Sequence, residues 1–235
     1  MNPKKPIPSA PLSEVAYQQI KEMIVNVKLR PGEQVDEGGL ASTLSIGRTP
    51  IREALFRLVA EELLQVRQGR GFVVRDVTLS DLKDLFEALL ILERSAAALA
   101  ARRINAEQIR ALEGINADFK KAWKKNDFIQ VTLVNSRFHR GIYEAAGNTF
   151  LNSYLNSLQN QSQRLAYLCY SKPAASIDLE SHGEHSIRDH ARLIECFAAG
   201  DEAGAVQTIT EHIRLFQNRV NDFATPSVME MNLFA

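Results

Sequence analysis

The stretch from Ser45 to Ala60 constrains the fold more than any other part of this chain. It opens with a glycine-containing turn and then carries a helix-start signal. Thr49 is suited to cap a helix, and Pro50 loses no needed N–H at the first helical position. Apolar residues follow at helical spacing and predict a helix over Arg48–Ala60 with one buried face: Ile51, Leu55, Leu58 and Val59.

The flanking segments place this helix in a larger motif. A shorter apolar pattern precedes the tight turn, so two short helices joined by a glycine-containing turn are expected, which is a helix-turn-helix. After the second helix, two short strand patterns flank Gln68-Gly69-Arg70-Gly71 and predict a hairpin with a basic tip, a wing. The expected elements are helices over 12–27, within 35–44 and over 48–60, and strands over 63–67 and 72–75.

The exposed side of the 48–60 helix carries the residues that suit a nucleic acid. Thr49, Arg52 and Glu53 fall opposite the apolar face, and Arg48 lies one turn before Arg52. Arginine pairs bidentately with the O6/N7 edge of guanine or binds phosphates, and a helix N-terminus itself favours anions. Taken alone, the same pattern also describes a short amphipathic helix with a solvated basic end.

Composition sets only broad bounds. The chain has 235 residues, of which 45% are hydrophobic and 24% charged, so it can bury a sizeable core. Lys+Arg and Asp+Glu both number 28, so net charge gives no sign of a nucleic-acid partner. Cys169 and Cys196 form neither a disulfide framework nor a zinc-finger spacing. With no signal peptide and no membrane-spanning apolar run, we expect a soluble, cytoplasmic protein with no membrane partner.

The second half of the chain shows helical periodicity almost without interruption. Residues 1–11 are expected to form a flexible arm, and 225–235 a C-terminal tail. Between them the chain divides into a winged helix-turn-helix domain over 12–76 and a six-helix bundle over 77–224, giving a mainly α protein. The six helices are expected from Leu79 to beyond Ala100, over 106–125, 127–146, 149–170, 184–199 and 201–223, with a polar loop over 171–181.

Over residues 12–76 the sequence resembles the N-terminal domain of the GntR family of bacterial transcription regulators. The resemblance rests on Leu29-Arg30-Pro31-Gly32-Glu33, Leu40-Ala41, Arg48-Thr49-Pro50-Ile51-Arg52-Glu53-Ala54-Leu55 and Arg67-Gln68-Gly69-Arg70-Gly71. It implies contacts to double-stranded DNA from Arg48, Thr49, Pro50, Arg52, Gln68, Gly69 and Arg70.

Two positions depart from that family's pattern. Gly38 stands where relatives often have an arginine, which puts one phosphate contact in doubt. Phe56 stands where relatives are commonly polar or basic, and it is expected either to pack or to touch a thymine methyl group or a sugar.

Histidines make up the second set of candidate functional residues. Asn135 and His139 are four residues apart on one predicted helix, while His190 and His212 lie within apolar helical patterns. Inward-facing side chains of a bundle build metal sites, and three imidazoles with one oxygen ligand suit zinc or nickel. Spacing alone is equally consistent with hydrogen-bonded core histidines. We expect His182 and His185 at the surface.

Over residues 79–223 the sequence resembles the FCD ligand-binding domain of the FadR subfamily, in its six-helix VanR branch. The resemblance rests on Phe138-His139-Arg140, Ala145-Ala146-Gly147-Asn148, His190, Gly200-Asp201 and His212. It implies a divalent metal on Asn135, His139, His190 and His212, next to an effector.

Two departures bear on the effector. Asn135 is neutral where many relatives have Asp, which leaves the ion's full charge to attract a carboxylate. Leu89 replaces an arginine usual four residues before Glu93, so the effector is expected to be less acidic or more apolar than usual.

We therefore expect a sequence-specific regulator, a repressor as is commonest in the family, that binds a palindromic operator as a homodimer. A small metabolite, an organic acid by resemblance, would control its DNA affinity. Two alternatives remain open: a regulator that senses the metal ion itself, and a metal-dependent hydrolytic enzyme. Against the enzyme, the chain has no HExxH motif, no nucleophile motif and no carboxylate placed as an obvious general base.

Overall fold

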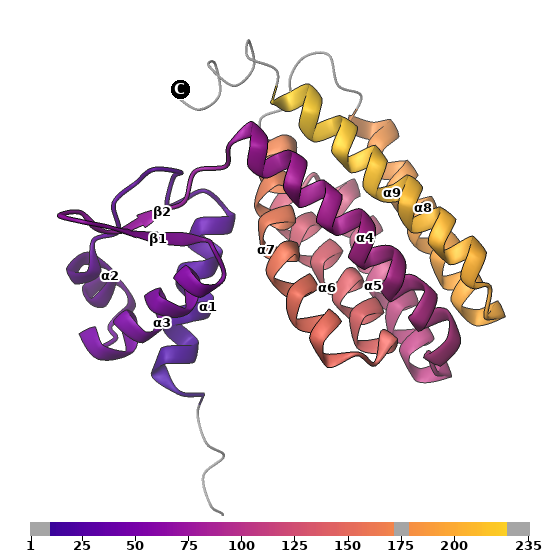
Figure 1. Ribbon diagram of the computed structural model, residues 1–235, viewed down its shortest axis with the longest axis horizontal. Coiled ribbons are helices and arrows are strands. Elements are labelled where there is room, and N and C mark those ends of the chain that lie inside the picture. The colour runs from indigo at the N-terminus through magenta and orange to yellow at the C-terminus, as the bar shows by residue number, and fades with distance from the viewer. Residues whose placement is uncertain (1–9, 172–178, 225–235) are drawn as a thin grey trace, which may run out of the picture. The chain divides into compact units, whose positions relative to one another are not determined.

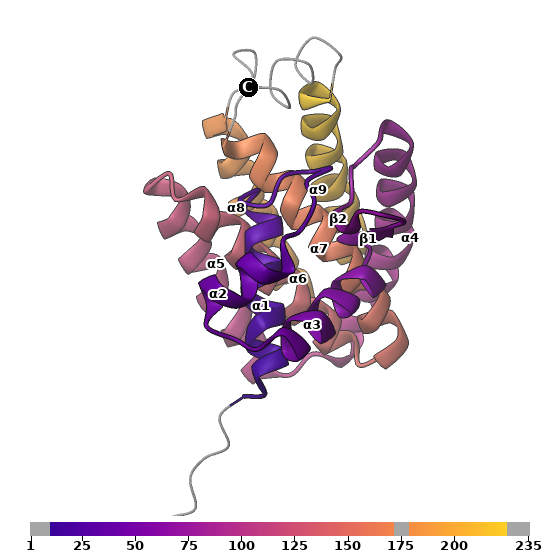
Figure 2. The ribbon, with the colours of Figure 1, turned by 90° about the vertical axis from the view of Figure 1, so that its left-hand side faces the viewer.

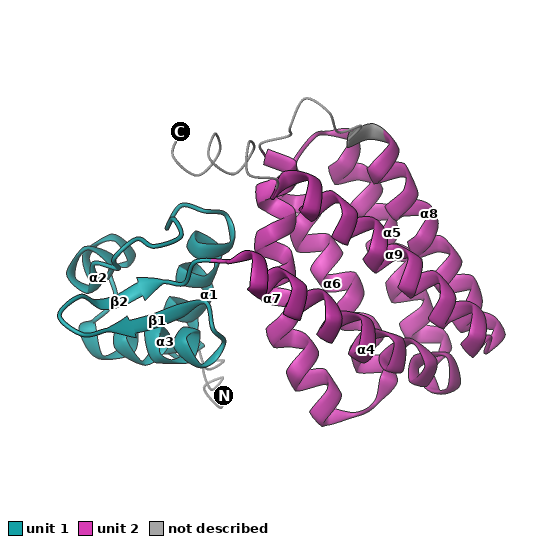
Figure 3. Cartoon of the chain, turned by 45° about the horizontal axis from the view of Figure 1, so that its top comes forward, with its two compact units in different colours: residues 1–76 teal, residues 77–235 magenta. Residues whose placement is uncertain are grey.

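The computed structural model describes residues 10–171 and 179–224, apart from the side chains of Leu179 and Glu180. The chain divides after Asp76 into two compact units, which Figure 3 shows in different colours. We call them the N-terminal unit (residues 1–76) and the helical unit (residues 77–235), and each is described by itself. None of the described helices is long and apolar enough to cross a membrane.

The N-terminal unit is a winged helix-turn-helix, as the sequence predicts. Its two strands pair antiparallel with Arg67 opposite Gly71, which leaves a three-residue tip, Gln68 to Arg70. A single bridge from Gln34 to Val73 adds the segment before the second helix to this hairpin. In Figure 1 the elements are α1 (Leu12–Val25), α2 (Glu37–Leu44), α3 (Arg48–Ala60), β1 (Leu64–Arg67) and β2 (Gly71–Val74).

One apolar core joins α1, α3 and the hairpin. Ile51, Leu55 and Leu58 of α3 are fully buried, as the helical spacing predicts, whereas Val59 is only partly buried. Ile20 and Ile24 of α1 pack in the same core. Because one face of α3 packs in this core, its other face is left exposed.

The start of α3 differs from the sequence prediction. Gly47, not Thr49, occupies the N-cap, and no side chain accepts a hydrogen bond there. Thr49 is already the second residue of the helix and Pro50 the third, so Thr49 cannot cap it. Proline is still tolerated at this place, because the first N–H groups of a helix have no intrahelical partner.

The described part of the helical unit contains the six predicted helices. Thr78 caps the first of them and forms a reciprocal capping box with Asp81, which fixes where the helix begins. The helices are α4 (Leu79–Arg103), α5 (Ala106–Lys124), α6 (Phe128–Ala146), α7 (Thr149–Ser171), α8 (Leu179–Ala199) and α9 (Glu202–Phe223). Figures 1 and 2 show α4 and α9 side by side.

Helix α8 begins earlier than the sequence predicts, at Leu179 instead of 184. Gly183 lies inside it, and a Cβ atom there would come within 1.8 Å of the Trp123 indole of α5. The missing side chain therefore lets α5 and α8 approach closely. The predicted arm over 1–11, the 171–181 loop and the 225–235 tail fall wholly or mostly outside the described residues.

Candidate functional site

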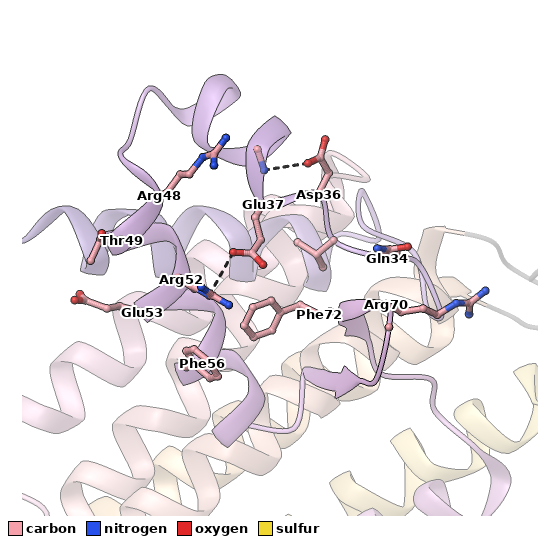
Figure 4. Close-up of a pocket in the computed structure, with 14 residues that line it drawn as sticks. Gln34, Asp36, Glu37, Arg48, Thr49, Arg52, Glu53, Phe56, Arg70 and Phe72 are labelled. Carbon is pink, nitrogen blue, oxygen red and sulfur yellow. Dashed lines mark hydrogen bonds and ion pairs between the residues drawn. The ribbon is translucent and has the colours of Figure 1, made fainter.

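The exposed face of α3 and the wing border one groove of about 1160 Å³ in the N-terminal unit (Figure 4). Its walls carry both charged and aromatic side chains. The lining residues are Gln34, Val35, Asp36, Glu37, Gly38, Arg48, Thr49, Arg52, Glu53, Phe56, Gly69, Arg70, Gly71 and Phe72.

Two of the arginines of α3, Arg48 and Arg52, are exposed in this groove. Arg52 forms an ion pair with Glu37 at 3.6 Å between Nε and Oε2, while 64% of its side chain stays accessible. Glu37 lies in the first turn of α2, where the helix dipole stabilises its charge. Glu37 thus orients the guanidinium of Arg52 across the groove and leaves most of it free for a ligand.

The wing tip owes its turn to glycine. Gly69 and Gly71 have φ angles of +75° and +70°, which only glycine adopts without strain, and the Arg70 N–H donates to the Arg67 carbonyl. Arg70 and Gly69 therefore reach the groove that Arg48, Thr49 and Arg52 line. Of the other predicted DNA contacts, exposed Gln68 and partly buried Pro50 do not line this groove.

The two departures from the family pattern lie in the same groove. The Gly38 N–H donates to the Asp36 carboxylate at 3.0 Å, so the start of α2 presents acidic groups in place of an arginine. Phe56 is 54% exposed, and its ring meets the ring of Phe72 edge to face at 5.1 Å between centroids.

The three predicted metal-binding histidines converge inside the helical unit. His139 of α6, His190 of α8 and His212 of α9 are all buried, and one ring nitrogen of each lies within 4.8 Å of the others. Asn135 is one turn before His139 on α6 and lines a small cavity together with His139 and His212. The structure therefore brings the three proposed histidine ligands together, with Asn135 beside two of them.

Two carboxylates, buried Glu93 and partly buried Asp189, lie against two of these imidazoles. His139 Nδ1 is 2.9 Å from Glu93 of α4, which also accepts a 2.6 Å hydrogen bond from Tyr143; His212 Nδ1 is 3.2 Å from Asp189. A carboxylate that accepts from Nδ1–H leaves the Nε2 lone pair free, as in carboxylate–histidine–metal triads. Burial raises the pKa of Glu93, but His139 and the hydrogen bonds outweigh this and lower it overall, so Glu93 stays ionised.

His190 is the member of the histidine cluster that most strongly indicates a bound ligand. It is fully buried and stacked on Phe138 at 3.9 Å between ring centroids, yet neither ring nitrogen has a hydrogen-bond partner among the described residues. Burial, followed by the neighbouring His212 and His139, holds its pKa well below the usual range, so the ring is neutral. An unpaired buried polar group is costly. A metal ion bound to the lone pair of one His190 ring nitrogen would give that nitrogen a partner. The residues present fit a late first-row divalent metal.

A cavity of about 40 Å³ adjoins the histidines. Since one water needs roughly 10–15 Å³ on this measure, the cavity holds about three waters or a group as small as a carboxylate. Its lining combines polar and apolar side chains from five helices: Leu89, Glu93, Asn135, His139, Gln159, Ser162, Ala166, Tyr170, His182, Ser186, His212, Ile213 and Phe216.

His182 corrects the prediction that it lies at the surface. It is buried, lines this cavity, and has its Nε2 3.2 Å from the Tyr170 hydroxyl. The early start of α8 explains the error, because His182, Ser186 and His190 then share one inward face at four-residue spacing. Burial lowers the pKa of His182 to about 3, so it faces the cavity as a neutral ring. His185 is exposed, as expected.

Sequence reasoning missed the carboxylates behind the histidines. Glu93 interrupts the apolar stripe of α4 four residues after Leu89 and four before Ala97, and that interruption was the available signal. Asp189 directly precedes His190 and gave no comparable signal. Glu37 is likewise recognisable only once α2 and α3 are placed together.

Comparisons with known proteins identify both units of the chain. The profile "Bacterial regulatory proteins, gntR family" matches residues 12–74, and "FCD domain" matches residues 84–215. The chain is 25% identical over 197 residues to the HTH-type transcriptional regulator YdhC of Bacillus subtilis, covering 83% of this chain and 85% of that protein. It is 28% identical to the HTH-type transcriptional regulator McbR of Escherichia coli, covering 78% and 80%.

The solved structure titled "E. coli McbR/YncC" has the same fold, with a TM-score of 0.82 and 24% identity, covering 92% of this chain and 100% of that one. The matched families and relatives are transcription regulators and not enzymes, which removes the hydrolase alternative. FCD domains often bind metal, in accord with the three-histidine cluster. The chain therefore belongs to the GntR family of bacterial regulators, as a DNA-binding transcription regulator with a C-terminal FCD domain.

Proposed function

We propose that this regulator is a repressor that binds operator DNA through the α3–wing groove. Arg48 and Arg52 contact base edges or phosphates in the major groove, and Thr49 and Pro50 lie against the backbone. The tip residues Gln68, Gly69 and Arg70 contact the neighbouring minor groove or its phosphates. The exposed arginine pair on the face that α3 does not bury is the observation that supports this most strongly.

The operator is palindromic and two copies of the chain bind it, one winged unit per half-site. Large apolar side chains exposed on the helical unit support pairing through that unit. Phe150 and Tyr154, one turn apart on α7, are 77% and 65% exposed, and Ile91 of α4 is 61% exposed. Sedimentation of the wild type should give a dimer, and Phe150→Ser with Tyr154→Ser should weaken it.

A divalent metal, zinc or nickel, is held by His139, His190, His212 and Asn135. When bound, it supplies a Lewis-acidic point for an oxygen of the effector. Glu93 and Asp189 fix the orientation of His139 and His212, and their two negative charges balance the charge of a divalent ion.

This charge balance limits the effector to one acid group. The cavity's described lining contains no lysine or arginine, and Leu89 occupies the position where an arginine was expected. A first carboxylate would bind the metal, whereas a second would meet no lysine or arginine in the cavity's described lining and would lie near Glu93. Leu89, Ile213 and Phe216 offer an apolar wall for the rest of the molecule.

Intrinsic fluorescence can test this, because Trp123 is the chain's one tryptophan and its ring lies 5.5 Å from that of Tyr170 in the cavity wall. Zinc-loaded protein is titrated with butyrate and with succinate, which have equal carbon counts, and DNA affinity is followed by anisotropy. Butyrate should bind more tightly, change DNA affinity, and lose its effect with a chelator. Tighter succinate binding would refute the single-acid limit, and no response to any acid would refute the effector site.

A regulator that senses the metal itself is the second candidate, and the small size of the cavity favours it. Room for about three waters suffices for an ion with its hydration, without any metabolite. The two candidates separate when zinc or nickel alone is titrated into the protein–DNA complex. A change of DNA affinity without any acid supports metal sensing.

A further inference from the structure

Phe56 is an aromatic side chain displayed where a DNA-binding groove would favour charge. It follows Arg48 and Arg52 at four-residue spacing, so all three rise along one face of α3. It is 54% exposed and lines the groove beside them. Figure 4 shows its ring at the end of the α3 row, next to the wing residue Phe72.

Phe72 holds this exposed ring in place. Phe72 is 4% exposed and belongs to the core, and its edge-to-face contact at 5.1 Å covers one side of the Phe56 ring. About half of Phe56 nevertheless stays exposed, and it lines the groove. A rigid apolar surface is therefore presented between the recognition helix and the wing.

An apolar surface in this position has one base-specific counterpart. Among the groups that base pairs expose in the major groove, the C5-methyl of thymine is apolar, and the others are hydrogen-bond donors or acceptors. We propose that Phe56 is a specificity-determining residue that packs against a thymine methyl group in each half-site of the operator. This inference rests on the proposed function of the groove.

The helix geometry also places that thymine. Four residues of α-helix rise about 6 Å, and base pairs stack at about 3.4 Å, so the thymine lies within about two base pairs of the base that Arg52 contacts. Hence Phe56 adds sequence information next to the arginine contact. If the Phe56 contact is lost, the acidic start of α2 offers no phosphate contact to replace it.

The test replaces thymine by uracil, which removes only the methyl group. Preferred duplexes are first selected from random DNA with the full-length wild-type protein and with Arg52→Ala, which locates the base that Arg52 contacts. Each thymine is then changed singly to uracil, and Kd is measured by anisotropy at fixed salt for the wild type, Phe56→Ala and Phe56→Leu. One methyl is worth about fourfold in Kd.

The expected result is one thymine near the Arg52 base whose uracil variant weakens wild-type binding about fourfold and leaves Phe56→Ala binding unchanged. Phe56→Leu, which keeps an apolar surface, should retain part of the difference. Thermal melts of both variants verify the fold. If Phe56→Ala fails to fold, the uracil series on the wild type and Phe56→Leu still decides.

Two outcomes would overturn the proposal. One is that no uracil substitution near the Arg52 base weakens the wild type. The other is that Phe56→Ala loses affinity equally for thymine and uracil duplexes, which would mean a sugar contact or simple packing. Neither touches the groove assignment itself, which fails separately if Arg48→Ala and Arg52→Ala bind selected DNA like the wild type.

Discussion

The two units place their functional side chains in opposite environments. In the N-terminal unit, Arg48 and Arg52 are exposed, and the core beneath them is built from apolar residues alone. In the helical unit, His139, His190 and His212 are themselves part of the interior, and carboxylates of Glu93 and Asp189 orient His139 and His212. An exposed site can change its ligand contacts without disturbing the fold, whereas a buried site couples ligand binding to stability.

The largest effect should come from removing both arginines of the exposed site. Each bidentate base contact is worth about 1–3 kcal/mol, so Arg48→Ala with Arg52→Ala should raise Kd for selected DNA by about 30-fold or more and leave the melting temperature unchanged. Anisotropy at fixed salt measures the first and calorimetry the second. Lys28→Ala, which removes an exposed charge outside the groove, is the matched control. Wild-type affinity in the double variant would contradict the assignment.

In the buried site, loss of one ligand should appear first in stability. Zinc at 100 times its Kd should stabilise the wild type by about 2.7 kcal/mol, and thermal melts with zinc and with chelator measure this. His190→Ala should abolish the zinc-dependent rise in melting temperature. His185→Ala, on the exposed side of the same helix, should keep it. An equal rise in both variants would place the metal elsewhere.

A smaller effect is expected from the carboxylate behind His139. Glu93→Gln should lower zinc affinity about 10-fold to 100-fold, because second-shell partners tune ligand basicity and orientation by that amount. Competition with a fluorescent zinc chelator measures the affinity. Glu144→Gln, exposed on α6, is the control. Unchanged zinc affinity in Glu93→Gln would show that His139 needs no carboxylate.

The smallest effect is predicted at the Glu37–Arg52 ion pair, since exposed pairs contribute about 0.2–1 kcal/mol. Glu37→Gln should strengthen binding to random DNA by removing a negative charge near phosphates, while the ratio of selected to random affinity falls up to about fivefold. Glu22→Gln, exposed on α1, controls for the charge change. An unaltered ratio would mean that Glu37 does not orient Arg52.

The sequence allowed most of the fold to be predicted, because apolar spacing and turn residues agree locally. The bounds of α3 and the wing with its basic tip follow from Ile51, Leu55, Gly69 and Gly71. The start of α8 was misjudged because glycine disfavours a helix by about 1 kcal/mol, and only the contact with Trp123 explains Gly183 there.

More of the exposed site than of the buried site could be predicted from the sequence, for a physical reason. Exposed residues on one helix face follow from spacing alone. Glu93, by contrast, meets His139 across 46 positions of sequence, a pairing that no local pattern contains. The burial of His182 was not predicted because the start of α8 was placed too late in the sequence.

The fit between Trp123 and Gly183 also limits how the small cavity can enlarge. An effector with a tail longer than its acid group needs extra space, and retreat of the beginning of α8 would strip the indole of its neighbour. Ile213 and Phe216 of α9 also line the cavity, and a change of their rotamers would enlarge it without moving a helix. Such a ligand would thus act through α9, which packs against α4, the helix that directly follows the DNA-binding unit.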